Sequence, residues 1–193
     1  MSMDQPLSLG TPSPVKLTVE YFETLHLAGM LDSHRRAELM DGNITEMSPM
    51  GMPHSIVMTR LLVRLHDALD RMGSDVMAMS APTIALPPHN APEPDITLAR
   101  VIGGERGYVD QQAVALVVEI SVSTLHYDLT VKRDLYARSE LPEYWTVDVD
   151  GRKVHQFWSP QDGAYTETRI VPLAGELRSA TMPDLAIDGA GVL

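Results

Sequence analysis

A carboxylate stands inside the most apolar β-like run of the chain. Glu119 lies in the stretch 113–121, where its neighbours are Ala, Val, Leu, Ile and a terminal Ser. An unpaired ionised carboxylate in a dry interior is costly, so such a residue normally has a cation, a metal ion or hydrogen-bond donors beside it. Asp95 precedes another strand-like segment, and Lys132 follows on a segment expected to be helical. Two strand carboxylates and one lysine suggest metal-assisted hydrolysis.

The regular spacing of residues along these strand-like and helical segments predicts which side chains point the same way. Strand alternation places Glu119 and Ser121 on one face of their strand. On the following segment Asp128, Lys132 and Tyr136 recur at intervals of four, which puts them on one stripe of a helix. Lys132 could therefore reach back toward the end of the strand.

Taken alone, each of these residues also has a plain structural interpretation. Asp128 and Lys132 have the spacing of an ordinary solvated helix pair, worth roughly 0.3–0.5 kcal/mol. Asp95 could be a turn or strand-start residue. Glu119 could form a structural ion pair with an arginine such as Arg100. The combination of these residues, and not any single one, favours a catalytic site.

The elements that must position these residues follow from hydrophobic spacing and turn signals. Helices are expected at 18–29, with Thr18 as its cap, and at 54–72. Asp41-Gly42 predicts a turn between two strands. Further strands are expected at 75–86, 96–101, 114–121, 144–149, 154–158 and 165–171, with a helix capped by Thr124 at 124–139. This order indicates a mixed α/β fold.

Length and composition indicate one globular domain. The chain has 193 residues with an apolar fraction of 44%, enough for a single core. Residues 1–14 are rich in Ser, Pro and Gly and are expected to be a disordered tail, which leaves 15–193 as the domain. The absence of cysteine excludes thiolate chemistry and favours the cytoplasm. No secretion signal or membrane span is expected, because no apolar run approaches roughly 20 residues.

The charge of the chain bears on nucleic-acid binding. A net charge of −11 argues against a general nucleic-acid binder, although an enzyme needs only a local positive groove. Such a groove could be lined by Arg60, Arg64 and Arg71 on the polar face of the long helix, together with Lys132 and Arg133. A solvated surface is the alternative. Arg64 is the member of this set that we select as a substrate-binding candidate.

Motifs of several other enzyme classes are absent. The seven histidines include no His-x-x-x-His pair typical of zinc sites. The chain also lacks a Gly-x-Ser-x-Gly turn, a Walker loop and a dinucleotide fingerprint. These absences exclude serine hydrolases of that type, nucleotide kinases and dehydrogenases.

Several ordered blocks of this sequence resemble the Uma2 family of endonucleases. The blocks are Glu38-Leu39-Met40-Asp41-Gly42, Pro94-Asp95, Val118-Glu119-Ile120-Ser121-Val122-Ser123-Thr124, then Asp128, Lys132 and Tyr136, and Glu143-Tyr144-Trp145-Thr146-Val147-Asp148. The resemblance extends from about Val15 to Trp158. It implies the PD-(D/E)XK restriction-endonuclease-like fold, a central mixed sheet flanked by helices.

The same resemblance implies a catalytic site. It implies that Asp95 and Glu119 are ligands of Mg²⁺ or Mn²⁺ and that Lys132 is the basic residue. Ligation by oxygen alone agrees with the absence of cysteine from the chain. In the general superfamily pattern the lysine stands two residues after the second acid, where this chain has Ser121. The lysine function would therefore move to Lys132, and the Uma2 pattern shares this departure.

The implied reaction is hydrolysis of a phosphodiester, with Lys132 orienting the attacking water or stabilising charge on phosphorus. Glu38 is a candidate accessory ligand or water-positioning residue, or else a strand-edge carboxylate. Ser121 could hydrogen-bond a ligand carboxylate, or be small for packing. His54, at a helix start that favours anions, could contact a substrate phosphate, or be a surface or capping residue.

The function expected from the sequence is a Mg²⁺- or Mn²⁺-dependent endonuclease acting on DNA or another nucleic acid. The alternative is a catalytically inactive module of the same fold that binds a protein partner. Retention of Asp95, Glu119 and Lys132 in order favours the enzyme. The strand-rich end at 144–171 offers edges and apolar faces for a homodimer. Duplex, single-stranded, branched and RNA substrates all stay open.

Overall fold

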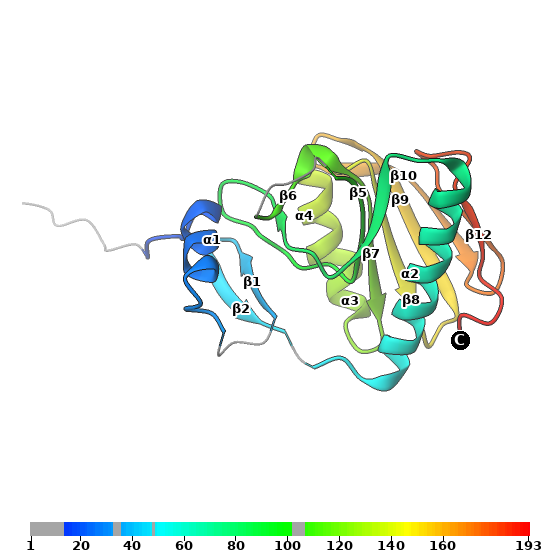
Figure 1. Ribbon diagram of the computed structural model, residues 1–193, viewed down its shortest axis with the longest axis horizontal. Helices are drawn as coiled ribbons and strands as arrows, with labels where there is room; N and C mark the ends of the chain where they lie inside the picture. Colours follow the sequence, from blue (N-terminus) through cyan, green and yellow to red (C-terminus); the bar gives the residue numbers. More distant parts are fainter. Residues whose placement is uncertain (1–13, 33–35, 48, 102–106) are drawn as a thin grey trace, which may run out of the picture.

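The computed structural model describes residues 14–32, 36–47, 49–101 and 107–193 (Figure 1). Its elements are α1 (Val19–Leu27), β1 (Ala37–Met40), β2 (Asn43–Glu46), α2 (Met52–Met72), β3 (Val76–Ser80), β4 (Ile84–Ala85), β5 (Ile96–Arg100), β6 (Val109–Asp110), η1 (Gln111–Ala113), β7 (Val114–Ser121), α3 (Leu125–Tyr127), η2 (Asp128–Lys132), α4 (Arg133–Arg138), β8 (Glu143–Asp148), β9 (Lys153–Gln161), β10 (Ala164–Pro172), β11 (Glu176–Arg178) and β12 (Ala186–Asp188). The N-terminal tail expected at 1–14 lies outside the described residues, apart from its last position.

A six-stranded sheet in the order β10-β9-β8-β7-β5-β3 forms the centre of the molecule. Strands β7 and β8 are parallel, and the other neighbouring pairs are antiparallel. Parallel neighbours need a crossover connection, and here α3, η2 and α4 supply it. The predicted mixed α/β sheet flanked by helices is confirmed.

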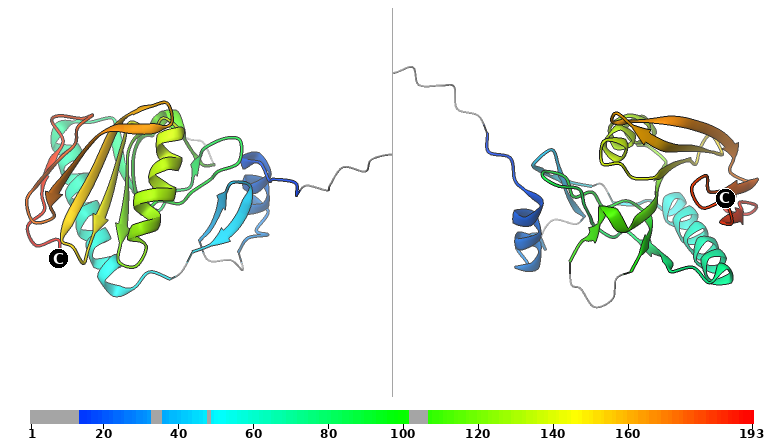
Figure 2. Two further views of the ribbon diagram at one scale, coloured as in Figure 1. Left: turned by 180° about the vertical axis from the view of Figure 1, so that it is seen from behind. Right: turned by 90° about the horizontal axis from the view of Figure 1, so that it is seen from above.

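The sheet carries a helix on each face (Figure 2). On one face Leu61 and Leu65 of α2 pack against Val118 of β7. On the other face Leu135 of α4 packs against Val117 of the same strand. Because side chains alternate along a strand, Glu119 and Ser121 share the α4 side with Val117. Among the described helices, none has both the length and the hydrophobicity to span a membrane.

A smaller layer lies at the end of the molecule opposite the C-terminus and consists of α1 and the β1–β2 hairpin (Figure 1). The Thr18 hydroxyl caps α1 by accepting from the amide of Tyr21, as predicted. The predicted turn at Asp41-Gly42 joins β1 to β2, and both residues have positive φ, 49° and 75°. Leu39 of β1 forms a bridge with Ala91, which holds the hairpin against the chain that leads into β5.

The segment predicted as one strand at 75–86 is divided between two sheets. Strand β3 ends at Ser80, and the next residue, Ala81, has a φ of 46°. After this turn and Pro82, β4 pairs with β6 and not with the central sheet. Residues 102–106, between β5 and β6, lie outside the described residues.

The segment predicted as one helix at 124–139 contains the π-helical stretch η2. Thr124 does not cap this helix with a side-chain bond to the backbone. Its hydroxyl donates instead to Oδ2 of Asp128, at 2.6 Å. A single π-helical turn inside a helix changes the direction of the side chains that follow, and such turns are frequent at functional sites. Here the π-helical turn includes Lys132.

Candidate active site

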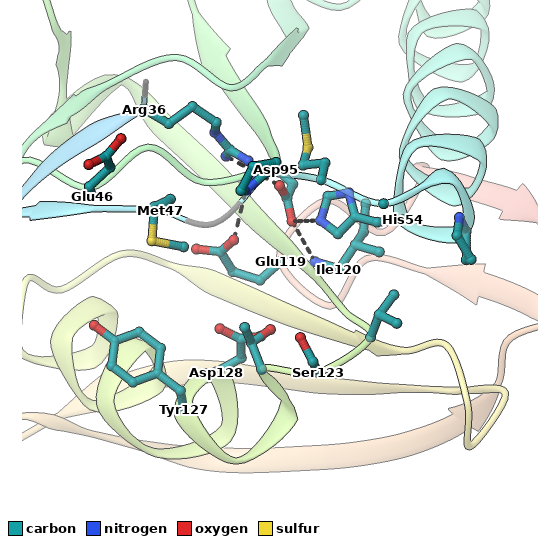
Figure 3. A pocket seen from close by; sticks show the side chains of 16 residues that line it. Arg36, Glu46, Met47, His54, Asp95, Glu119, Ile120, Ser123, Tyr127 and Asp128 are labelled. Atoms are coloured by element: carbon teal, nitrogen blue, oxygen red, sulfur yellow. Dashed lines mark hydrogen bonds and ion pairs between the residues drawn. The ribbon is translucent and has the colours of Figure 1, made fainter. Parts of the chain in front are cut away.

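Asp95 and Glu119 lie on neighbouring antiparallel strands. Asp95 directly precedes β5, whose first residue Ile96 is in register with Val118. The amide of Ile120 donates to Oδ2 of Asp95 at 2.8 Å, and the amide of Asp95 is 3.4 Å from Oε2 of Glu119. Each carboxylate is therefore held by the backbone of the other strand. Both side chains face the same space (Figure 3).

That space is a cleft of about 450 Å³ between the central sheet and the segment that leads from the hairpin into α2. Its lining comes from Arg36, from Asp95 and from residues of the segments 46–54 and 119–128. The cleft thus lies where β7 ends and α3 begins. Concave sites of roughly 300–1,000 Å³ that combine apolar walls with a few convergent polar groups are typical ligand sites.

Lys132 lies behind the two acids and does not line the cleft. Its ammonium donates to both oxygens of Glu38, at 2.8 and 3.0 Å, and is 3.4 Å from Oε1 of Glu119. Lys132 and Glu38 are each 1% exposed. The structure therefore brings the four catalytic candidates Asp95, Glu119, Lys132 and Glu38 together. Their roles in catalysis stay predictions.

The simpler interpretation of Asp95 as a strand-start residue holds, because it directly precedes β5, but those of the other residues do not. Asp128 and Lys132 are both buried, so they do not form a solvated helix pair. Arg100 forms an exposed ion pair with Asp75, and so it is not the partner of Glu119. Glu38 is not an exposed edge carboxylate, because the amide of Glu93 and the ammonium of Lys132 both donate to it.

Burial dominates the electrostatics of Glu119. It raises the pKa of this carboxyl group to about 8, with smaller raising effects from Asp95, Asp128 and Glu38, while the charge of Lys132 lowers it. Burial lowers the pKa of Lys132, but the carboxylates of Glu119 and Glu38 raise it further, and the net shift is upward. The lysine is consequently held as a cation beside Glu119.

Tyr136 completes the surroundings of Glu119. Its hydroxyl donates to Oε1 of Glu119 at 2.7 Å. Burial raises the pKa of the Tyr136 phenol well above its ordinary value, so the group stays a donor. The sequence signal for this contact was the stripe that Tyr136 shares with Lys132, four residues earlier.

Asp128 is a third carboxylate in the lining of the cleft. Its Oδ2 accepts hydrogen bonds from the hydroxyls of Ser121 and Thr124, both at 2.6 Å. Burial raises the pKa of Asp128, and the two hydroxyl donors lower it in part. Ser121 thus contacts Asp128 and does not contact either predicted metal ligand. Sequence reasoning placed Asp128 on the correct stripe but assigned it no role.

Two basic side chains contact Asp95 from within the cleft lining. His54, near the start of α2, places Nε2 2.9 Å from Oδ2 of Asp95, and its buried Nδ1 has no partner among the described residues. Arg36 places a guanidinium nitrogen 3.5 Å from Oδ1 of Asp95 while Nε donates to Glu93 at 3.2 Å. His54 was predicted at the site, as a phosphate contact. Arg36 was missed, because nothing in the local sequence connects it to a residue 59 positions later.

Comparison with known proteins identifies the family of this chain. Residues 19–189 match the Uma2 family, whose description is "Putative restriction endonuclease". The chain belongs to the Uma2 family. The resemblance predicted from the sequence is therefore confirmed. No curated protein matches the chain.

A solved Uma2-like structure shares the fold. It is described as the "crystal structure of a putative nuclease belonging to DUF820 from Anabaena variabilis", and it is 15% identical over 93% of this chain and 97% of that chain, with a TM-score of 0.66. This likeness supports the restriction-endonuclease-like arrangement of sheet and helices. The family and the fold together support a nuclease function.

The arginines of the predicted strip in this Uma2 chain are not among the residues that line the cleft. Arg64 donates to the carbonyl of Ala190 at 2.8 Å, and Arg60 donates to the carbonyl of Gly191 at 3.0 Å. Arg133 pairs with the adjacent Asp134. In the structure, Arg60 and Arg64 hold the C-terminal segment against α2. A contact between Arg64 and nucleic acid stays a prediction.

The two strand carboxylates of this Uma2 site fit a divalent cation. Mg²⁺ and Mn²⁺ prefer oxygen ligands, and Mg²⁺ is commonly held by one or two carboxylates together with water and substrate phosphate. Asp95 and Glu119 supply two carboxylates that both reach the cleft. Within the described part of the chain, no three His, Asp or Glu side chains form a group that could hold a metal ion. The donor set therefore suits a cation that is completed by water and substrate.

Proposed function

We propose that this chain is a nuclease that hydrolyses phosphodiester bonds of DNA with Mg²⁺ or Mn²⁺ held by Asp95 and Glu119. The observation that carries the proposal is the convergence of these two carboxylates, from neighbouring strands, on one cleft with Lys132 buried behind them. Membership of the Uma2 family supports the class of reaction. When bound, the ion supplies a polarised phosphate and a water of lowered pKa.

The residues around the acids prepare them for this role. The amide of Ile120 and the ring of His54 both contact Oδ2 of Asp95, which fixes the carboxylate and leaves Oδ1 toward Arg36. Such supporting contacts orient metal ligands and tune their basicity. Lys132 acts on Glu119 from the protein side, where its charge favours the ionised carboxylate that a cation requires.

The charge of the cleft explains why a cation is needed. Among the described residues of its lining, the acidic side chains outnumber the single arginine, and they are Glu46, Asp95, Glu119 and Asp128. An anionic phosphodiester would be repelled by this lining unless bound cations offset it. The net charge of −11 is therefore compatible with a nuclease whose substrate affinity depends on metal ions and not on a basic groove.

The test is cleavage of supercoiled plasmid and of labelled single-stranded DNA by the purified protein. We expect cleavage in Mg²⁺ or Mn²⁺, none in EDTA, and strong loss in Asp95→Asn and Glu119→Gln. Asp75→Asn is the matched control, because Asp75 is an exposed carboxylate paired with Arg100. Cleavage that persists in both site variants would reject the assignment. A folded wild-type protein that cuts neither substrate in either metal would favour the protein-binding alternative.

A further inference from the structure

Tyr127 is an aromatic side chain of the cleft lining. It ends α3, directly before Asp128, and its ring projects into the cleft (Figure 3). Across the described residues, its hydroxyl makes no hydrogen bond and its ring contacts no other ring. The ring is half-buried, and burial raises the pKa of its phenol, so the group stays neutral.

The other tyrosines packed into the protein differ from Tyr127. Tyr108, Tyr136, Tyr144 and Tyr165 each contact another aromatic ring and each hydrogen-bond through the hydroxyl. This is the usual state of a tyrosine with a buried body. Tyr21 resembles Tyr127 in having no ring partner, but it is 64% exposed on α1. Tyr127 is therefore the tyrosine whose face and hydroxyl are both available to a molecule in the cleft.

The cleft that Tyr127 lines also has apolar members in its wall. Met47, Pro49, Met50 and Val122 line the same cleft, and Met50 and Val122 are each 38% exposed. Figure 3 shows Met47 entering the cleft from the wall opposite Tyr127. The cleft thus combines an apolar, aromatic part with a carboxylate part. A nucleotide has the matching composition, since its base is flat and apolar on both faces and its phosphate is anionic.

The size of the cleft limits the form of the nucleotide. A volume of about 450 Å³ is in the range of sites that hold one small ligand, so the cleft suits one nucleotide unit. Inside a duplex each base is paired and stacked, and its face reaches a protein side chain only after extrusion, which costs free energy. An unpaired base avoids this cost.

On the basis of the proposed nuclease function, we infer that the cleft takes one unpaired nucleotide of a DNA strand, with Tyr127 stacked on its base and the adjacent phosphate at Asp95 and Glu119. The preferred substrate class is therefore single-stranded DNA, or the unpaired region of a longer DNA. Stacking on an aromatic ring tolerates any base, so little dependence on base identity is expected.

Binding to single strands tests the stacking contact. The probe is a fluorescently labelled single-stranded DNA with Ca²⁺ in place of Mg²⁺, and the readout is fluorescence anisotropy. We expect Tyr127→Leu to weaken binding by about tenfold, in line with the usual effect of removing a stacking ring. Tyr127→Phe keeps the ring and should keep the affinity. Tyr21→Leu is the matched control and should bind as the wild type does.

A second probe separates stacking from contacts with phosphate. The same strand with abasic sites keeps its phosphates but offers no base. It should bind more weakly than the intact strand, and Tyr127→Leu should weaken it no further. Equal affinities of wild type and Tyr127→Leu for the intact strand would overturn the inference. Circular dichroism of each variant establishes that it is folded, since Tyr127 is only half-buried.

Cleavage rates in Mg²⁺ or Mn²⁺ distinguish failure of this inference from failure of the proposed function. A single strand cut faster than the fully paired duplex, with the rate lowered in Tyr127→Leu and kept in Tyr127→Phe, supports the inference. A duplex cut as fast as the single strand, without any effect of Tyr127→Leu, overturns it while the nuclease function stands. Wild-type protein that neither binds nor cuts DNA overturns both. An RNA strand that is preferred, with the same dependence on Tyr127, overturns DNA as the substrate and keeps the stacking site.

Discussion

The ammonium group of Lys132 lies 2.8 and 3.0 Å from the two carboxylate oxygens of Glu38, and each residue is 1% exposed. The pair joins the β1–β2 hairpin to the π-helical turn of the crossover connection, across 94 residues of sequence. It therefore couples the smaller layer of the protein to the back of the candidate site. A shift of the hairpin would move Glu38 and so displace the ammonium group of Lys132 beside Glu119.

The first prediction concerns this pair. Glu38→Gln leaves the cation of Lys132 buried with Glu119 as its remaining carboxylate partner, and breaking a buried ion pair on one side costs about 3–5 kcal/mol. We expect a loss of that order in the free energy of unfolding, measured by urea titration. Asp41→Asn is the control, because the ion pair of Asp41 with Lys16 is exposed and should matter little. Equal stability of Glu38→Gln and wild type would show that the pair does not hold the hairpin.

The second prediction is that Glu143, a buried carboxylate, serves structure and not catalysis. It accepts hydrogen bonds from Trp145, Ser179 and the backbone amides of Ala180 and Thr181. This set attaches the segment between β11 and β12 to the first residue of β8. Hydrogen bonds to a charged group contribute roughly 1.5–3 kcal/mol each, and removing the charge weakens all of them.

We therefore expect Glu143→Gln to lower the unfolding free energy by about 2–4 kcal/mol and to leave the cleavage rate of the folded protein unchanged. Differential scanning calorimetry measures the stability. The plasmid assay, carried out well below the melting temperature, measures the cleavage rate. Glu167→Gln, on the partly exposed strand β10, is the control for loss of one carboxylate. A cleavage defect in a fully folded Glu143→Gln would assign Glu143 to the site.

The comparison of sequence with structure shows which contacts local patterns can predict. Asp95 and Glu119 could be singled out because one precedes a strand-like segment and the other lies near the end of one, and the antiparallel pairing of these strands in the structure brings them together. The helical face that carries Lys132 could also be predicted, from the four-residue spacing of Asp128, Lys132 and Tyr136. The pairing of Lys132 with Glu38 was not, because it depends on how the hairpin packs onto the sheet.

Contacts that depend on the final packing escaped prediction for the same reason. Arg64 has the helical position of a phosphate-binding residue, yet its guanidinium binds a backbone carbonyl 126 residues later. Thr124 has the type and position of a helix cap, yet its hydroxyl binds the carboxylate of Asp128. In both cases a polar side chain hydrogen-bonds to an acceptor that folding brings close, and the sequence does not reveal which acceptor that is.

The third prediction is a pH dependence of stability in the metal-free protein. Burial raises the pKa of Glu119 from 4.5 to about 8, so the folded protein binds a proton that the unfolded chain releases. This contribution to stability is complete below pH 4.5 and is lost as the pH rises toward about 8. In EDTA, the unfolding free energy of the wild type should therefore fall relative to that of Glu119→Gln as the pH rises from 4.5 to about 8. A difference that stays constant across the interval would show that Glu119 is ionised throughout.

The fourth prediction tests His54 as a positioning residue for Asp95. Its Nε2 lies 2.9 Å from Oδ2 of Asp95, and partners of this kind change metal affinity by roughly 10–100-fold when they are removed. We expect His54→Gln to weaken Mn²⁺ binding, measured by isothermal titration calorimetry without substrate, by about tenfold or more. His66→Gln is the matched control, since His66 lies on the same helix with its side chain 50% exposed. If His54→Gln binds Mn²⁺ as the wild type does but binds DNA more weakly, then His54 contacts the phosphate and does not position the carboxylate.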